Sequence, residues 1–464
     1  MIQGRGQFME NRIHSNALSG IEIESRAYPE ITRNKIWGNQ SGFFIHTNGQ
    51  GVLEDNEIFD NAGAGVRIET NGNPTLRRNK IYDGRGEGVH ISNKGRGLIE
   101  ENEVYGNALF GIAVTKESSP IIRKNRIHSG KQAGVRFYDN GQGVLENNKI
   151  FDNAKTGVVI EYNFLKNIKC KPSCHRTGSN PKITRNKIRG NQKGGVLIYD
   201  NGQGMLEENE IFDNAMAGVG IEADGNPMLR RNKIYDGRGK GVLISDKGRG
   251  VLEDNDIYRN ADTGVLILSK SNPTFRRNRV YEGHAAGIEI ANDAIATLES
   301  NAIFRNRFGG LFLATGVQPT LHDNKIYDND DLVEKTIAKG GCLFEITSRA
   351  SSPMHEIYRC DTCKMTEEDT ICLNCIRTCH AEHIVHFVGY DFFFCDCGAG
   401  TLRDPCKLLN KVEQLPESAK EIEVGPHAET GGTDSNVEKG VRDNEATVAE
   451  VTERVDDLGL NSES

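Results

Sequence analysis

Residues 228–258, MLRRNKIYDGRGKGVLISDKGRGVLEDNDIY, decide the fold, because they contain one full unit of a repeat and the start of the next. Asn-x-Ile occurs at Asn232 and again 23 residues later at Asn255, with Gly241 followed by apolar-x-apolar between them. Asn followed by any residue and Ile or Val recurs at Asn11, Asn34, Asn56, Asn79, Asn102, Asn125, Asn148, Asn186, Asn209, Asn232, Asn255, Asn278, Asn301 and Asn324. The spacing is 23 residues almost everywhere, 22 once and 38 once, and the long step predicts a loop insertion at about 163–178.

A period of this length indicates a solenoid. Each unit holds two or three stretches of three to five alternating residues, separated by Gly, Asn, Asp or Pro, which are too short and too rich in glycine for helices. Short strands that stack on their equivalents in the next unit form a parallel β-helix, and the right-handed crossover is strongly favoured. The sequence therefore predicts an all-β protein, a right-handed parallel β-helix of about fourteen rungs over residues 1–346.

The repeated Asn is expected to point inward at a turn and to stack on its neighbours as an amide ladder. Two residues before it, the charge alternates from rung to rung, as in Glu54, Arg77, Glu100 and Arg123. The residue directly before the Asn follows a similar pattern. Each carboxylate is then expected to lie between two cations, which avoids the repulsion of stacked like charges.

Many parallel β-helices cleave glycans, and this alternative has to be weighed. Glycoside hydrolysis needs two carboxylates about 5–10 Å apart, one of them with a raised pKa. The regular carboxylates here have Arg or Lys neighbours, which lower a pKa, and no Asp or Glu pair breaks the repeat. We therefore expect no catalytic residues, and keep a glycan-binding or glycan-cleaving protein as the alternative.

Composition and charge argue against nucleic-acid-binding and membrane-spanning proteins. Residues 407–464 hold 14 acidic and 6 basic side chains, so the rest of the chain is neutral, which argues against nucleic-acid binding. No run of about 18 apolar residues predicts a membrane helix. The start of the sequence lacks the features of a signal peptide, so we expect a reducing compartment, the nucleus or cytoplasm. The acidic residues 410–464 are expected to be disordered.

The middle residue of Gly-apolar-x-apolar should face outward, and it becomes mostly apolar in the second half of the repeat. An exposed apolar row of this kind usually marks a contact surface. The hypothesis is that a protein partner binds this row, and the other reading is that a segment of the chain covers it. The residues concerned are Val159, Leu197, Leu243, Leu266 and Phe312.

The repeat stops near Met354, and eight cysteines follow within residues 354–409. Their spacing is that of tetrahedral zinc ligands: Cys360-x2-Cys363, Cys372-x2-Cys375, Cys379-His380-x2-His383 and Cys395-x-Cys397. A disulfide framework is the competing interpretation. A module this small lacks an adequate core, so bound metal should supply much of its folding free energy. We therefore expect structural zinc.

The order C-x2-C, C-x2-C, H-x2-H and C-D-C-G resembles a UBR box, a zinc module that reads destabilising N-termini in ubiquitin ligases. A UBR box directly after a β-helix with this repeat resembles the family of F-box only protein 11, over residues 1 to about 410. In that family the β-helix carries substrates for an SCF-type (Skp1–cullin–F-box) ubiquitin ligase. The F-box that docks the adaptor is not expected in this chain, because the repeat begins within its first residues.

The resemblance implies two or three structural zinc ions. One would be held by Cys360, Cys363, His380 and His383, and a second by Cys342, Cys372, Cys375 and Cys395. Cys375 would bridge to a third ion with Cys397 and Cys406, whose last ligand is open between Cys379 and His386. Through Cys342 the module is expected to be fastened to the last rung and to cap the β-helix. The motif is followed by Ala399 instead of an acidic residue, which leaves Asp396 and residues 367–369 for a basic N-terminus and argues against that activity.

These observations predict a non-catalytic scaffold that recognises protein substrates for a ubiquitin ligase, with Skp1 and cullin as partners only if an F-box is present. A decoy that binds the same substrates without joining the ligase is the further alternative.

Overall fold

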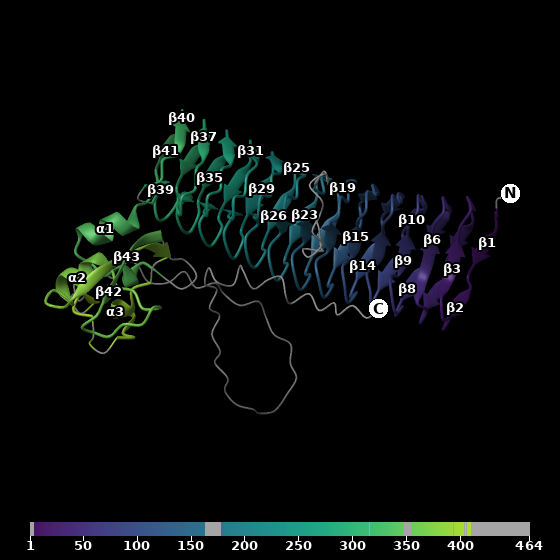
Figure 1. Cartoon of the computed structure of the whole chain (residues 1–464), viewed down its shortest axis with the longest axis horizontal. Helices are drawn as coiled ribbons and strands as arrows, with labels where there is room; N and C mark the ends of the chain where they lie inside the picture. Colours follow the sequence, from purple (N-terminus) through teal and green to yellow (C-terminus); the bar gives the residue numbers. More distant parts are fainter. Residues whose placement is uncertain are drawn as a thin grey trace, which may run out of the picture. The chain divides into compact units, whose positions relative to one another are not determined.

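The computed structural model describes residues 4–162, 178–314, 316–347, 354–392, 394–402, 404 and 406–409. They belong to one compact unit, Met1–Glu413, shown in Figure 1. Except for Gly178, the predicted insertion lies outside the described residues, and so does the predicted tail at 410–464. Among the described residues no helix is both long and apolar enough to span a membrane.

Three parallel sheets form the β-helix, and each sheet takes every third strand of the chain. Sheet A contains β1 (Gln7–Met9), β4 (Glu30–Thr32), β7 (Val52–Glu54), β10 (Thr75–Arg77), β13 (Leu98–Glu100), β16 (Ile121–Arg123), β19 (Val144–Glu146), β22 (Lys182–Thr184), β25 (Met205–Glu207), β28 (Met228–Arg230), β31 (Val251–Glu253), β34 (Thr274–Arg276), β37 (Thr297–Glu299) and β40 (Thr320–His322). Sheet B contains β2 (Arg12–His14), β5 (Lys35–Trp37), β8 (Glu57–Phe59), β11 (Lys80–Tyr82), β14 (Glu103–Tyr105), β17 (Arg126–His128), β20 (Lys149–Phe151), β23 (Lys187–Arg189), β26 (Glu210–Phe212), β29 (Lys233–Tyr235), β32 (Asp256–Tyr258), β35 (Arg279–Tyr281), β38 (Ala302–Phe304) and β41 (Lys325–Tyr327).

Sheet C has one strand fewer than the other two. It contains β3 (Ser19–Ile23), β6 (Ser41–Ile45), β9 (Val66–Ile68), β12 (Val89–Ile91), β15 (Ile112–Val114), β18 (Val135–Phe137), β21 (Val158–Ile160), β24 (Val196–Ile198), β27 (Val219–Ile221), β30 (Val242–Ile244), β33 (Val265–Ile267), β36 (Ile288–Ile290) and β39 (Leu311–Leu313). The prediction of an all-β parallel solenoid of about fourteen rungs is confirmed.

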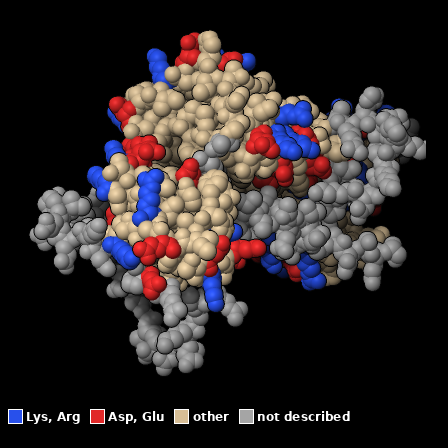
Figure 2. Space-filling model, turned by 60° about the vertical axis from the view of Figure 1, so that its left-hand side comes forward, with Lys and Arg blue, Asp and Glu red and all other residues tan. Residues whose placement is uncertain are grey.

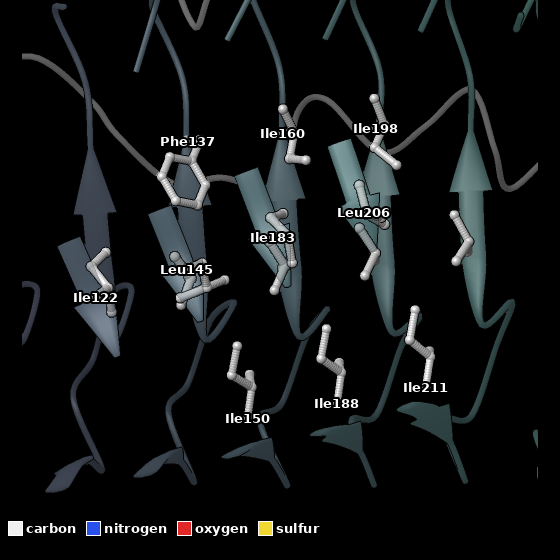
Figure 3. Close-up of a cluster of buried hydrophobic side chains, with 14 of the residues drawn as sticks. Ile122, Phe137, Leu145, Ile150, Ile160, Ile183, Ile188, Ile198, Leu206 and Ile211 are labelled. Carbon is white, nitrogen blue, oxygen red and sulfur yellow. The ribbon is translucent and has the colours of Figure 1, made fainter. Parts of the chain in front are cut away.

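The core follows from the alternation of side chains within each short strand. The middle residue of each strand in sheets A and B points inward, and in sheet C the two flanking residues do so. Figure 3 shows the result, with Ile183 from sheet A, Ile188 from sheet B and Ile198 from sheet C meeting inside the coil. All three are fully buried, and the equivalent residues of successive rungs form one continuous core.

Amide ladders hold the turns of this core in register. Asn232 lies 1% exposed and donates from its backbone N and its Nδ2 to Asn255 Oδ1 at 2.9 Å, and Nδ2 also donates to Leu206 O at 2.8 Å. The residue before it, Arg231, has a left-handed φ of 52°, which costs free energy in a residue with a side chain. The amide is buried from Asn34 to Asn301 and stabilises this bend in those rungs, and the inward ladder is confirmed.

A second amide ladder, five residues later in each rung, was not predicted. It contains Asn16, Asn39, Asn61, Asn107, Asn153, Asn191, Asn214, Asn260, Asn306 and Asn329. Asn306 Nδ2 donates to Asn329 Oδ1 at 3.0 Å. At four rungs glycine replaces the asparagine, and Gly84 N, for example, donates to Asn107 Oδ1 at 3.1 Å. Glycine therefore keeps the backbone hydrogen bond and loses only the side-chain part of the ladder.

After β41 the chain leaves the repeat and forms the C-terminal module. Its elements are α1 (Leu332–Ala338), the 3₁₀ helix η1 (Leu343–Glu345), α2 (Leu373–Thr378), α3 (Asp396–Ala399) and a two-stranded antiparallel sheet of β42 (Met354–Cys360) and β43 (Val385–Phe392). The sequence predicts that the β-helix extends to residue 346, and this is wrong, because its last strand is β41. Cys342 instead lies among the cysteines of the module, and Leu343 begins a helix.

The prediction that the module caps the β-helix is also wrong for most of the last rung. Val333 of α1 shares a buried cluster with Phe308 and Cys342, so α1 packs beside the end of sheet C. Leu321 and Ile326, which occupy inward positions of β40 and β41, are 46% and 47% exposed. The module is fastened beside the last rung and leaves the ends of sheets A and B open.

Candidate metal centre

One Cys/His cluster lies beside α2, at the end of the module's sheet where β42 ends and β43 begins. Cys360 ends β42, Cys363 follows in the turn, and His380 and His383 lie in the segment between α2 and β43. Cys363 Sγ lies 3.4 Å from His380 Nδ1 and 3.3 Å from His383 Nδ1, and the two Nδ1 atoms are 3.2 Å apart. All four donor atoms lie within 4.8 Å of one another.

Two further clusters contain only cysteines and share one of them. The first consists of Cys342, Cys372, Cys375 and Cys395, all buried. The second consists of Cys375, Cys379, Cys397 and Cys406. Cys375 Sγ lies 3.5 Å from Cys342 Sγ and 3.6 Å from Cys406 Sγ. Cys375 is therefore placed to bridge two ions.

The separations fit tetrahedral metal coordination. Zinc binds thiolate at about 2.3 Å and imidazole at about 2.0–2.1 Å, which places two tetrahedral sulfur ligands about 3.8 Å apart and two nitrogen ligands about 3.3 Å apart. The measured distances of 3.2 to 3.8 Å lie in this range. They exceed the 2.0 Å of a disulfide, and the nine described cysteines are free. These clusters could therefore hold metal ions.

Local structure explains how the ligands are positioned. Asn374 Nδ2 donates to Ile337 O at 3.1 Å and to Gly341 O at 2.9 Å, which ties α2 to the segment that carries Cys342. A Cβ on Gly398 would lie 2.6 Å from Cys342 Sγ and would also clash with Phe344. The glycine of the C-D-C-G motif is therefore required by close packing over a ligand.

The electrostatics differ among the clustered cysteines: neighbouring thiols raise the pKa of Cys342 and Cys375, and burial raises that of Cys363 and Cys379, whereas Cys397 favours the thiolate. A hydrogen bond with Cys375 lowers the pKa of Cys397 to about 5, although burial alone would raise it. A thiolate is the form that binds metal. Several thiolates this close together repel one another unless a cation lies between them.

All ten predicted metal ligands fall in these clusters. The sequence left the eleventh ligand open between Cys379 and His386, and of these two only Cys379 lies in a cluster, with its Sγ 3.8 Å from Cys406 Sγ. His386 is exposed and its Nδ1 lies 3.3 Å from Asp361. In the sequence, the only indication that Cys379 is a ligand is that it precedes His380. That adjacency does not determine which cluster the Cys379 side chain joins.

Two of the acidic residues considered for a basic N-terminus, Asp369 and Asp396, accept hydrogen bonds within the module. Asp396 accepts hydrogen bonds from Thr370 N at 2.7 Å and from Thr401 Oγ1 at 2.9 Å. Asp369 accepts from Thr366 N at 2.7 Å and from its hydroxyl at 2.9 Å. These contacts give both carboxylates a role in holding turns.

The apolar row proposed for partner binding lies on the outer face of sheet C. Pairing in register places Val159 beside Leu197 and Leu243 beside Leu266, and none of these four belongs to the inner core. Its members differ in exposure, however. Val159, Leu197, Leu243 and Phe312 are partly buried, whereas Leu266 is only 1% exposed. The expectation of a continuous exposed row is therefore wrong at Leu266, which packs in a small cluster with Leu268, Ala291 and Ala314.

A buried ionic cluster on the same face was not predicted. Arg136 contacts Glu161, and their side chains are 5% and 3% exposed. Tyr199 donates its hydroxyl hydrogen to Glu161, and the Arg136 guanidinium lies 4.5 Å from the Tyr138 ring centre. Glu161 and Tyr199 come from opposite sides of residues 163–177, so the cluster links the two rungs that flank this segment. These side chains break the repeat, and no period marks them in the sequence.

The regular charge ladders form as predicted. Arg77 contacts Glu54 at 3.7 Å and Glu100 at 2.5 Å, and Arg123 contacts Glu100 at 2.7 Å. In Figure 2 cationic and anionic side chains accordingly lie next to each other in small groups. Burial opposes ionisation of Glu100, but hydrogen bonds from Arg123 and Arg77 outweigh it and hold its pKa below the usual value.

An aromatic ladder on the outer face of sheet B was also missed. Its stacked rings are His14, Trp37, Phe59, Tyr82, Tyr105, His128 and Phe151, followed by Phe212, Tyr235, Tyr258, Tyr281, Phe304 and Tyr327. Arg189 separates the two runs and lies 5.2 Å from the Phe151 ring centre. An aromatic residue or histidine three positions after most ladder asparagines is the signal that could have revealed it.

Comparison with curated proteins gives short matches. A stretch of 82 residues is 58% identical to the F-box protein dre-1 of Caenorhabditis elegans and covers 18% of this chain and 9% of that protein. A stretch of 81 residues is 35% identical to a protein of Dictyostelium discoideum named as an E3 ubiquitin-protein ligase, and covers 17% of this chain and 1% of that protein. The chain thus spans less than a tenth of the length of these relatives.

Solved structures with a similar fold include β-helix enzymes. The A-module of the mannuronan C-5 epimerase AlgE6 of Azotobacter vinelandii is 14% identical, with a TM-score of 0.45, over 66% of this chain and 90% of that one. The periplasmic alginate epimerase AlgG is 15% identical, with a TM-score of 0.41, over 66% of this chain and 78% of that one.

A family model described as the right handed beta helix region matches residues 1–108, 84–174, 168–326 and 271–397, which together cover most of the chain. Its handedness agrees with the sequence prediction. The chain belongs to the right-handed β-helix family.

Proposed function

We propose that this chain is a non-catalytic, substrate-recognition scaffold of an SCF-type ubiquitin ligase. The observation that carries the proposal is the stretch that is 58% identical to an F-box protein, in a chain whose β-helix makes up most of the described residues. The match to a protein named as an E3 ubiquitin-protein ligase supports the same pathway. The similarity to the F-box only protein 11 family, with its β-helix followed by a UBR-type module, is the finer form of this proposal.

The carboxylates of the β-helix favour recognition over glycan cleavage. Glycoside hydrolysis needs a carboxylic acid whose pKa is raised, so that it is protonated near neutral pH. The described carboxyl groups of the β-helix whose pKa clearly departs from the usual value, Glu69, Glu87 and Glu100, are all shifted downward. Burial opposes each shift, and hydrogen bonds from neighbouring basic side chains dominate.

In this proposal three zinc ions stabilise the C-terminal module and take no part in chemistry. Each cluster supplies four protein ligands, with Cys375 counted twice, so no ligand position is left for substrate. The ligands come from separate segments between Cys342 and Cys406, and metal binding would therefore hold these segments together. The nucleus or cytoplasm, where thiols stay reduced, is the proposed location.

Co-purification tests the ligase role. The tagged chain would be recovered from cells that express it, with and without a proteasome inhibitor, and the bound proteins identified by mass spectrometry. Recovery of Skp1 and cullin, with substrates enriched by the inhibitor, supports a ligase receptor. Protein partners without the ligase core would support a scaffold or decoy that does not itself join the ligase core. Recovery of glycans and no protein would contradict the proposal.

The hypothesis that a protein partner binds the apolar row on the outer face of sheet C can be tested at Leu197 and Leu243, which are partly exposed. Leu197→Glu with Leu243→Glu should reduce recovery of partners at least tenfold, because both side chains point outward from sheet C. Met205→Glu with Met228→Glu is the matched control, since these methionines are 38% and 40% exposed on sheet A of neighbouring rungs. Equal loss in both pairs would show that charge alone, and not this face, reduces binding.

A further inference from the structure

The last rung of the β-helix ends in an open, apolar sheet edge. Leu321 of β40 and Ile326 of β41 occupy the positions that Leu298 and Ile303 fill in the preceding rung. The earlier pair is fully buried, whereas Leu321 and Ile326 are 46% and 47% exposed. Within the part of the chain that the structure describes, no strand pairs with the outer edge of β40 or β41. Core side chains and strand backbone are thus both accessible at this edge.

The hydrogen-bond pattern of the preceding rungs shows what the edge lacks. Ser300 N donates to His322 O at 2.8 Å, and Asn301 donates from its backbone N and its Nδ2 to Asn324 Oδ1 at 3.0 and 2.9 Å. In the last rung, the equivalent donors are the N of Asp323 and the amides of Asn324. A docked strand would satisfy them with a carbonyl and with an asparagine side chain at the same register. Open edges of this kind accept an added strand.

The charged residues at the edge indicate which charges a docked strand would need. Asp323 is 74% exposed, and the charge ladders place a basic residue opposite an acidic one at this position, as in the contact of Arg277 with Asp254 at 2.9 Å. Two residues later Lys325 would face an acidic residue, as Lys187 faces Glu210 at 2.9 Å. The exposed Asp328 directly follows β41 and adds negative charge next to this edge, whereas Asp330 contacts Lys335.

The aromatic ladder extends to the edge as well. The ring of Tyr327 stacks on that of Phe304 with centroids 5.1 Å apart, and it is 45% exposed. An aromatic residue in the docked strand would cover its free face, as each ring covers the next along the ladder. Stacked aromatic pairs of this kind stabilise by about 0.5–1.5 kcal/mol beyond the burial of area.

We propose that this edge binds an extended segment of a partner protein, which completes a further rung by reading apolar-x-basic-Asn-acidic-apolar-aromatic. The apolar residues would cover Leu321 and Ile326, the basic residue would pair with Asp323, and the acidic residue with Lys325. The asparagine would continue the inner amide ladder beyond Asn324. This inference rests on the proposed recognition function and names the class of partner that would bind. Binding at this edge can nevertheless be tested without any ligase component.

Peptide binding to the intact chain tests the proposal. The probe is a fluorescent peptide with the sequence TLTRNEIY, and the matched control is TLTENKIY, in which the two charges are exchanged. We expect fluorescence anisotropy to show saturable binding of the first peptide below about 1 mM, and at least tenfold weaker binding of the second. The double variant Asp323→Arg with Lys325→Glu should reverse this preference. Leu321→Glu should abolish binding of both peptides while leaving the thermal unfolding temperature close to that of the wild type, since the side chain is half exposed.

Three results would overturn the inference. The first is no binding of either peptide, and the second is a preference that the exchange of charges at Asp323 and Lys325 leaves unchanged. The third is self-association of the chain that rises with concentration and disappears in Leu321→Glu, which would assign the edge to a second copy. Failure here leaves the co-purification result unaffected, because Skp1 and cullin can be recovered without this edge.

Discussion

The β-helix and the C-terminal module hold their folds together by opposite means. In the β-helix, the core, the amide ladders and the charge ladders recur in most rungs, so that each contact has many equivalents. In the module, short elements meet around three clusters of cysteine and histidine, and one residue, Cys375, belongs to two of them. A single substitution should therefore be local in the first region and global in the second.

The largest effect is expected from Cys375→Ser. We expect this variant to lose two of three zinc ions, because its thiolate is placed to bridge two clusters, and to lose the structure of the module. Cys360→Ser is the matched control and should lose one ion. Native mass spectrometry counts the ions, and equal losses in the two variants would contradict the bridging role of Cys375.

The next largest effect should come from the buried ion pair of Arg136 and Glu161. Arg136→Ala leaves a carboxylate with 3% exposure without its cation, which typically costs about 3–5 kcal/mol. Arg78→Ala removes an exposed ladder pair with Asp55, which solvent screens, and should change stability much less. Urea unfolding at pH 7 measures both. If the two variants were equally stable, the cluster beside residues 163–177 would have no special role.

The inner amide ladder should give a smaller effect that depends on position. Asn232→Ala removes buried hydrogen bonds to Asn255 and Leu206 and should lower the free energy of unfolding by about 1–3 kcal/mol. Asn324→Ala lies at the open end, where the amide is only partly buried, and should cost less. A larger loss at Asn324 would show that the end of the β-helix is covered in solution.

The smallest effect is expected from the pH dependence of Glu100. Because its pKa is lower in the folded protein than the ordinary value near 4.5, the carboxylate stabilises the fold above that pH. This contribution should be lost as the pH falls below about 4.5 and through the lower folded pKa. Glu100→Gln should reduce the loss of stability between pH 6 and pH 3 in chemical unfolding. An unchanged slope would mean that Arg77 and Arg123 do not hold this carboxylate.

The features that could be predicted from the sequence are those that recur in the 23-residue repeat. The 23-residue spacing of residues such as Asn232 and Asn255 revealed the β-helix, its inner amide ladder and its alternating charges. The second amide ladder was hidden because glycine replaces asparagine at Gly84 and three equivalent positions. The cluster of Arg136 and Glu161 carries no period at all, since its members are 25 residues apart and meet only through the stacking of rungs.

In the module, the spacing of cysteine and histidine residues predicted which side chains are candidate metal ligands, but it did not predict which of them share a cluster. Motifs such as Cys360-x2-Cys363 place two ligands on one turn, but which cluster Cys379 joins depends on how α2 packs against residues near Cys406. The cap was mispredicted for a similar reason. The sequence places Cys342 in the β-helix, whereas its Sγ lies in a cysteine cluster of the module, and Leu321 of the last rung is exposed.

Hydrogen exchange before and after removal of metal by a chelator tests the central claim most directly. The account predicts that amides of α2, β42 and β43 lose protection when metal is removed, while amides of the β-helix strands up to β39 keep theirs. Loss of protection throughout the β-helix would contradict the account, because the rungs would then depend on the module. Unchanged protection in the module would contradict it equally, since its fold would not require metal.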